Sequence, residues 1–161
     1  MDIVFRDAWR RNDQRQAQDA KAFWHGLIPP AERERRVTEL CCMAYKRDRL
    51  VGLSTAYLTF FPQVKARLAA YRCAIDPEFR RHELAKAITS RSIAILKRWS
   101  DANPSEKVLG LAAVIQALEL RGMALRPVWP EYELDLNLAC YLPSGEQLRV
   151  AWFPNDKIQA A

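Results

Sequence analysis

The chain has 161 residues, of which 50% are hydrophobic and 27% are charged, and its formal net charge is +6 at pH 7. This length and composition exclude an intrinsically disordered chain and fit a single domain over residues 1–161 with its own hydrophobic core. The sequence has no apolar run of membrane-spanning length, and residues 1–11 lack the layout of a signal peptide, so we expect a cytoplasmic protein with no membrane partner.

The positive charge raises the question of nucleic acid as a partner. Basic residues are interleaved with acidic ones rather than gathered, as in Glu32–Arg36, where Arg33, Arg35 and Arg36 alternate with glutamates. A spread of this kind disfavours a nucleic-acid-binding module, which stays the weaker alternative, and would equally attract an acidic cofactor.

The four cysteines give no sign of a metal site or a disulfide framework. They are Cys41, Cys42, Cys73 and Cys140, and their spacing matches no metal-ligand pattern. We therefore expect reduced cysteines in the core and no bound metal.

The N-terminal region predicts one strand and two helices. Residues 2–9 alternate as a short strand does, and Asn12-Asp13 can cap a helix that runs to about Trp24. Pro29-Pro30 then breaks the chain, and a short charged helix is expected over residues 31–37.

Three strands are expected next. Residues 39–45 and 50–60 are strand-like and form a hairpin, with Gly52 as a candidate bulge in its second strand. Residues 66–75 alternate apolar and polar side chains, and Asp76-Pro77 ends this central strand.

A long helix follows the central strand and reaches Ser100. Its apolar stripe consists of Leu84, Ile88, Ile95, Leu96 and Trp99. Residues 107–114 form a continuous apolar run, which is typical of a strand buried on both faces and parallel to its neighbour.

The C-terminal third predicts a short helix over residues 115–121 and two more strands. Pro127 and Pro130 indicate a rigid connection, residues 132–142 alternate as a strand, and residues 147–153 form the last strand. The fold class is therefore mixed α/β (α+β), with a mostly antiparallel central sheet of about six to seven strands flanked by helices.

The turn between the central strand and the long helix is suited to an anion. Unpaired backbone N–H groups at the start of a helix point in one direction and attract phosphate. Arg80, Arg81, His82 and Lys86 surround this turn.

Residues 76–88 resemble the pyrophosphate loop of the GNAT superfamily of N-acyltransferases. In that family a strand, a proline and an aromatic precede Arg/Gln-x-x-Gly-x-Gly/Ala at the start of a helix. Arg80 matches the first position of this pattern and Ala85 the last, while Glu83 stands where the family usually has glycine. The order of the expected elements is also that of the GNAT fold.

The resemblance implies an enzyme that moves an acetyl or other acyl group from acyl-CoA to an amine acceptor. It implies a cofactor site made of Cys73, Ala74 and Ile75, which would hold the pantetheine arm, and of Arg80, Arg81, His82, Glu83, Leu84, Ala85 and Lys86, which would hold the pyrophosphate. It does not name the acceptor or the acyl chain length.

No single catalytic residue is marked by a second feature of the sequence. Leu118 stands where the family often has a tyrosine that protonates the leaving thiolate. Candidate bases on expected strands are Glu133, Asp135 and Glu39, or Tyr57 acting through water; the alternative for each is an ordinary exposed side chain.

Glu83 and Leu118 keep a second interpretation open, in which a GNAT-like domain has lost catalysis and serves as a binding protein. Expected edge strands near the C-terminus also leave a homodimer open.

Overall fold

The computed structural model describes residues 2–80, 82–115 and 121–154. Its helical elements are α1 (Gln14–Phe23), α2 (Pro30–Arg36), η1 (Val37–Glu39), η2 (Pro77–Phe79), α3 (His82–Ala102), η3 (Pro104–Glu106) and η5 (Arg121–Leu125). Its strands are β1 (Ile3–Asp7), β2 (Leu40–Lys46), β3 (Arg49–Phe61), β4 (Ala66–Ile75), β5 (Gly110–Ile115), β6 (Val128–Tyr132), β7 (Leu134–Tyr141) and β8 (Gln147–Trp152). Arg81, the stretch around Leu118 and the last residues of the chain lie outside the described part.

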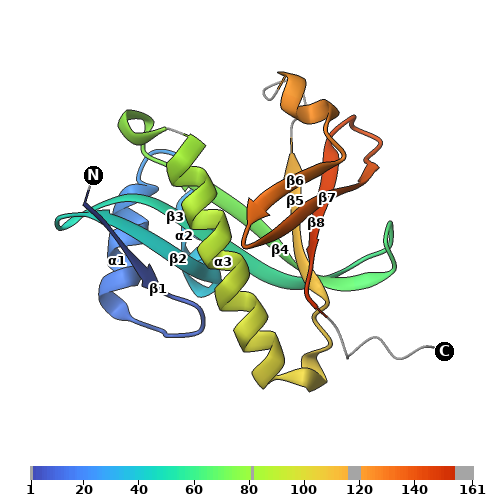
Figure 1. Ribbon diagram of the computed structural model, residues 1–161. Coiled ribbons are helices and arrows are strands. Elements are labelled where there is room, and N and C mark those ends of the chain that lie inside the picture. Colours follow the sequence, from blue (N-terminus) through green and yellow to red (C-terminus); the bar gives the residue numbers. More distant parts are fainter. Residues whose placement is uncertain (1, 81, 116–120, 155–161) are drawn as a thin grey trace.

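The strands form one mixed sheet in the order β1-β2-β3-β4-β5-β8-β7-β6, with the parallel pair β4–β5 at its centre (Figure 1). The other neighbouring strands pair antiparallel. The expected α/β class, the mostly antiparallel sheet and the parallel pairing of β5 are thus confirmed.

The sheet has eight strands, which corrects the expected six to seven. The additional strand is β6, in the segment where Pro127 and Pro130 indicated only a rigid connection. A proline cannot donate to a strand ladder, but β6 is an edge strand and tolerates Pro130 because one of its sides has no neighbour.

Helices cover both faces of the sheet. In Figure 1, α3 lies across the front, and α1 and α2 lie behind. The expected stripe of α3 faces the main core, where Ile88 and Leu96 are fully buried. Behind the sheet, a second core joins Ala20 and Trp24 of the α1 region to strands β2 and β3.

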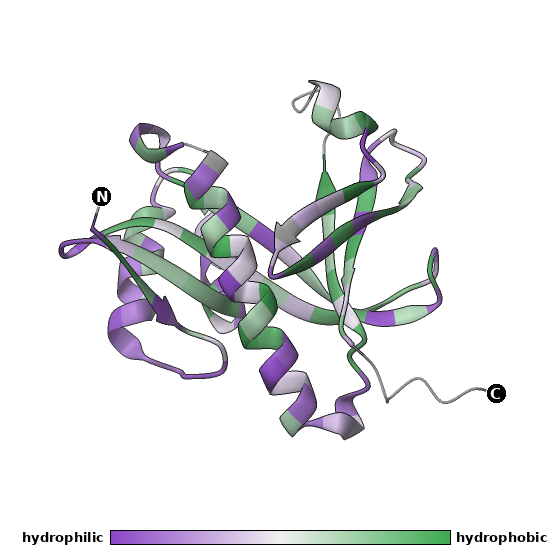
Figure 2. Ribbon diagram, in the orientation of Figure 1, coloured by the Kyte–Doolittle hydropathy of each residue, from purple (hydrophilic) through white to green (hydrophobic). Residues whose placement is uncertain are grey.

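The start and end of α1 follow the expected signals. The side chain of Asp13 accepts a hydrogen bond from the backbone N–H of Gln16, which caps the helix. Gly26 has a φ of +76°, a left-handed conformation that suits glycine after a helix end. Figure 2 shows α1 as predominantly hydrophilic, in keeping with a helix that buries one narrow face.

A buried polar contact joins α3 to the sheet. The hydroxyl oxygens of Ser54 on β3 and Ser92 on α3 are 2.7 Å apart, and Ser92 also donates to the backbone carbonyl of Ile88. These bonds satisfy hydroxyl groups that have no access to water.

Gly52 on β3 leaves room for the Ile88 side chain of α3. A Cβ atom at this position would lie 2.8 Å from Cδ1 of Ile88, which is tighter than side chains tolerate. We expect Gly52→Val to lower the free energy of unfolding by about 2 kcal/mol, because the fully buried Ile88 side chain must leave its present position. Urea denaturation measures this change. The matched control is Gly122→Val, since a Cβ at Gly122 meets nothing within 4 Å; equal losses in the two variants would contradict the explanation.

None of the helices in the described part of the chain is long and apolar enough to span a membrane.

Candidate functional site

The two central strands separate part of the way along their length. Ala69, Ala70 and Tyr71 of β4 pair with Leu111, Ala112 and Ala113 of β5. Beyond this point both strands continue, β4 to Ile75 and β5 to Ile115, without further pairing between them. The backbone of residues 72–75 on this side of β4 is therefore available to a ligand.

A cavity of about 670 Å³ opens where the strands diverge. Residues from several elements line it: Arg36 at the end of α2, Tyr71, Arg72 and Cys73 of β4, Ala85, Lys86 and Thr89 of α3, Ala113, Val114 and Ile115 of β5, Met123, Trp129, Tyr132 and Leu136 from η5 to β7, and Glu146 before β8. This volume is in the range of a small-molecule or cofactor site.

The cavity is reached from both faces of the sheet, because neighbouring residues of β4 point to opposite faces. Tyr71 points to the α3 face, where its hydroxyl lies 2.9 Å from the Thr89 hydroxyl. Arg72 points to the other face, where its guanidinium lies over the ring of Tyr57 at 6.0 Å from the centroid.

The Tyr71 hydroxyl is part of a fixed chain of hydrogen bonds. Thr89 contacts it and in turn donates to the backbone carbonyl of Ala85 at 2.8 Å. Burial raises the pKa of Tyr71 well above its ordinary value, so the phenol is neutral at physiological pH.

Cys73 lies at the cavity and is solvent-exposed, which corrects its expected place in the core. All four cysteines are free, as expected, and Cys41 and Cys42 are buried. The residue as a whole is exposed, but its thiol is desolvated by neighbouring protein atoms, and this desolvation raises the pKa of Cys73 to about 11. A hydrogen bond with the Tyr71 hydroxyl acts in the opposite direction and offsets only part of the rise. A thiol that is protonated at neutral pH is a poor nucleophile, so Cys73 does not suit covalent catalysis.

An aromatic wall closes the cavity on the side of β6. Lys86 lies over the ring of Tyr132, with its Nζ 5.6 Å from the centroid. Burial raises the pKa of Tyr132, although the charge of Arg149 acts in the opposite direction. Trp129 lies beside Tyr132 and donates from its indole N–H to the backbone carbonyl of Met123.

Arg149 of β8 supports this wall from behind. Its guanidinium stacks on Trp129 at 3.7 Å from the ring centroid and donates to the backbone carbonyl of Arg126 at 2.7 Å. Through these contacts Arg149 ties the segment after β5 to the sheet, and burial lowers the pKa of its guanidinium from the ordinary value.

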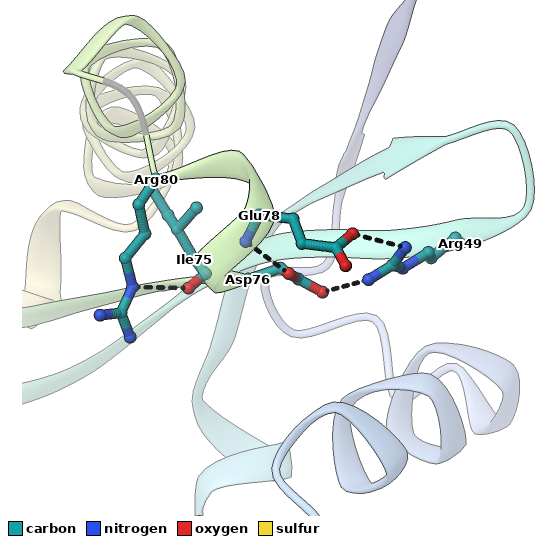
Figure 3. Close-up of polar contacts among 5 residues, drawn as sticks. All are labelled: Arg49, Ile75, Asp76, Glu78 and Arg80. Atoms are coloured by element: carbon teal, nitrogen blue, oxygen red, sulfur yellow. Dashed lines mark hydrogen bonds and ion pairs between the residues drawn. The ribbon is translucent and has the colours of Figure 1, made fainter.

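The loop between β4 and α3 is held by ionic contacts (Figure 3). Arg49 of β3 donates to the carboxylates of Asp76 at 2.7 Å and of Glu78 at 3.2 Å. Asp76 also accepts from the backbone N–H of Glu78, and this bond is the main reason that its pKa is lowered. Arg80 donates from its Nε to the carbonyl of Ile75, which leaves the rest of its exposed guanidinium directed to solvent.

Glu83 occupies the first turn of α3 and is exposed. It does not belong to the described non-glycine residues with positive φ. Glycine is therefore not needed for the backbone conformation at this position, and the effect of Glu83 on an anion is one of charge and bulk.

The structure brings three of the expected cofactor residues to the cavity: Cys73, Ala85 and Lys86. Ala74 and Ile75 lie at the end of β4, Leu84 packs into the main core, Arg80 and Glu83 are exposed, and His82 opens α3. Their roles toward a cofactor, and that of Arg81, stay predictions.

The expected bases lie outside the cavity lining. Glu133 and Asp135 are exposed beside the β6–β7 turn, and Tyr57 is exposed under the guanidinium of Arg72. Glu39 lies in η1, which corrects its expected place on a strand. Three charged residues that do line the cavity, Arg36, Arg72 and Glu146, were not identified from the sequence. No local pattern marks them, since they come from a helix end, a strand and a turn.

The described residues contain no group of three or more His, Cys, Asp or Glu side chains that could hold a metal ion.

Comparison with models of protein families and with curated protein sequences gives no match. Solved structures, in contrast, match nearly the whole chain. A bacterial toxin covers 94% of this chain and 90% of its own, with 10% identity and a TM-score of 0.58. NAA60 of Arabidopsis thaliana, solved with acetyl-CoA, covers 94% and 100%, with 13% identity and a TM-score of 0.57. An acetyltransferase of the GNAT family from Streptococcus pneumoniae covers 94% and 99%, with 11% identity and a TM-score of 0.55.

The chain therefore has the acyl-CoA N-acyltransferase fold. This is the fold that the resemblance of residues 76–88 to the GNAT superfamily implied.

Proposed function

We propose that this protein binds acyl-CoA in the cavity between β4 and β5 and transfers the acyl group to an amine. The observation that carries this proposal is the separation of the parallel strands after Tyr71 and Ala113, beside the first turns of α3. A similar fold in NAA60 was solved with acetyl-CoA, which supports acyl-CoA as the cofactor.

The pantetheine arm would bind along the end of β4. Residues 73–75 have backbone groups without a β5 partner, and amide groups of pantetheine can pair with them as a neighbouring strand would. The pyrophosphate would lie at the start of α3, where the helix dipole and the Arg80 and Lys86 side chains favour negative charge.

Transfer requires that the acceptor ammonium loses a proton and that its nitrogen attacks the thioester carbonyl carbon. The C–S bond then breaks, the CoA thiolate takes up a proton, and the nitrogen releases its remaining extra proton. We assign the first proton transfer to Glu146, a carboxylate at the cavity, acting directly or through water.

We assign protonation of the thiolate to Tyr132. Its phenol is at the cavity and its pKa is raised by burial, so it carries a proton at neutral pH. Tyr132 would thereby take the role of the tyrosine that the family often has at the position of Leu118. Glu133, Asp135 and Tyr57 stay the bases predicted from the sequence alone.

A catalytically silent acyl-CoA-binding protein is the second candidate. Leu118 and Glu83 favour it, because each replaces a residue that the family commonly uses. Acetyl-CoA binding without release of free CoA thiol in the presence of any amine would favour this function. A cytoplasmic location and a homodimer stay predictions from the sequence.

The proposal is tested by calorimetric titration with acetyl-CoA. Wild type is expected to bind, and Lys86→Ala is expected to weaken binding about tenfold, because one cation at the phosphate site is lost. Lys97→Ala is the matched control, since Lys97 lies on the same helix, pairs with Asp101 and does not line the cavity. Absence of binding to wild type at millimolar acetyl-CoA would refute the proposed function.

A further inference from the structure

The charged side chains at the cavity indicate the chemistry of the acceptor. Arg36 and Arg72 approach from the sheet face that carries α1 and α2, and Glu146 approaches from the open end of β5. We propose that the acceptor is a small zwitterionic amine, whose anionic group binds Arg72 and Arg36 and whose ammonium binds Glu146. This inference rests on the proposed function.

Arg72 has the features of a residue that recognises an anion. It is exposed to the cavity, and among the described residues it forms no ion pair; its contact is with the ring of Tyr57. The ring limits the positions of the guanidinium, so less side-chain entropy is lost when a ligand binds. A planar guanidinium binds a carboxylate or phosphate with two parallel hydrogen bonds.

Arg36 supplies a second guanidinium at the cavity. It lies in the last turn of α2, where its Nη2 forms an ion pair with Glu32. Its Nε is buried and has no hydrogen-bond partner in the described part of the chain. The ion pair with Glu32 holds the guanidinium at the cavity, where it adds a second positive charge beside Arg72 for an anionic group.

Glu146 provides the opposite charge. It is half-buried in the turn before β8, and the hydroxyl of Ser144 donates to its Oε1 at 2.8 Å. Gln147, the next residue, pairs with Ile115 at the end of β5, which places Glu146 beside the gap between the central strands. An ammonium bound there lies next to the carboxylate that we assign as the base.

The size of the cavity limits the acceptor to a small molecule. About 670 Å³ must hold the thioester end of the cofactor as well as the acceptor. An amine with a carboxylate or a phosphate a few bonds away fits both the volume and the separation of charge, whereas a polypeptide N-terminus has a neutral amide in place of the anion.

The first experiment measures release of CoA thiol from acetyl-CoA with three sets of acceptors. These are an equimolar mixture of the proteinogenic α-amino acids other than cysteine, aspartate and glutamate, the same mixture as carboxamides, and phosphoethanolamine. We expect kcat/KM for the amino acids or for phosphoethanolamine to exceed that for the carboxamides at least about tenfold. Activity with the amino acids would identify the anionic group of the acceptor as a carboxylate, and activity with phosphoethanolamine would identify it as a phosphate.

The second experiment changes the charge at the cavity. Arg72→Gln is expected to remove the preference for anionic acceptors by raising their KM about tenfold, with the KM for acetyl-CoA unchanged. Arg98→Gln is the control, because Arg98 is an exposed residue of α3 outside the cavity lining. A purely structural role of Arg72 would alter acidic and amide acceptors equally.

The outcomes separate this inference from the proposed function. Acetyl-CoA binding with equal use of acids and carboxamides, or with turnover of none of the three sets, overturns the zwitterionic acceptor and leaves cofactor binding in place. Failure of acetyl-CoA to bind in the calorimetric titration overturns both.

Discussion

Replacing Arg149 by methionine is expected to lower the free energy of unfolding by about 3 kcal/mol, because several buried polar groups lose their partners together. Arg149 is fully buried, and its Nε donates to the side-chain oxygen of Gln147 at 2.9 Å. Its Nη2 donates to the carbonyls of Arg126 and Ala124. Methionine fills a similar volume over Trp129 but offers no donor, so the Arg126 carbonyl and the Gln147 oxygen lose this partner.

Urea denaturation of wild type and Arg149→Met measures this loss, and Arg98→Met serves as the control at an exposed position. Arg149→Lys is informative as well, since it keeps the charge but cannot donate in a fork. An unchanged midpoint in Arg149→Met would mean that the hydrogen bonds only offset the desolvation of a buried guanidinium.

Much of the sheet could be predicted from the sequence because its strands carry local signals. Alternation in residues 66–75 predicted β4, and the unbroken apolar run after the long helix predicted a buried strand parallel to it. Strand β6 carries no such signal. Pro130 argues against a strand in the sheet interior, and only the tertiary structure reveals that this strand lies at an edge.

The candidate site was predictable only where one continuous segment forms it. Cys73, Ala85 and Lys86 were predicted as cofactor residues because residues 76–88 resemble the GNAT pyrophosphate loop, and all three line the cavity. Arg36 and Glu146 lie far apart in the sequence, and the residues around each of them are typical of an ordinary surface position. They meet at one cavity because β5 pairs with β8 while β4 and β5 separate. No periodicity in the sequence predicts this arrangement of strands.

Glu83 departs from the sequence motif without requiring an unusual backbone conformation. Its presence in place of glycine indicated a departure from the GNAT pattern, yet the described backbone at this position is helical and needs no glycine. What remains is a negative charge in the first helical turn, where it favours the helix dipole and repels a bound phosphate.

Replacing Glu146 by glutamine is expected to lower kcat/KM for the preferred amine by about 10²–10⁴-fold, because general base catalysis typically contributes that much. Glutamine has nearly the same shape and still accepts a hydrogen bond from Ser144, so the turn keeps its structure. The dissociation constant of acetyl-CoA is expected to stay within about twofold of wild type, since Glu146 is assigned to the acceptor and not to the cofactor.

Asp135→Asn is the matched comparison, because Asp135 is an exposed carboxylate of β7 that the sequence nominated as a base and that does not line the cavity. Steady-state kinetics with the preferred amine should leave this variant within about threefold of wild type, and Glu146→Asp should retain part of the activity. The reverse pattern, with a large loss in Asp135→Asn and none in Glu146→Gln, would return the role of base to the residue predicted from the sequence. In that case the acceptor must approach over β7, and Glu146 would be a turn residue whose place at the cavity is incidental.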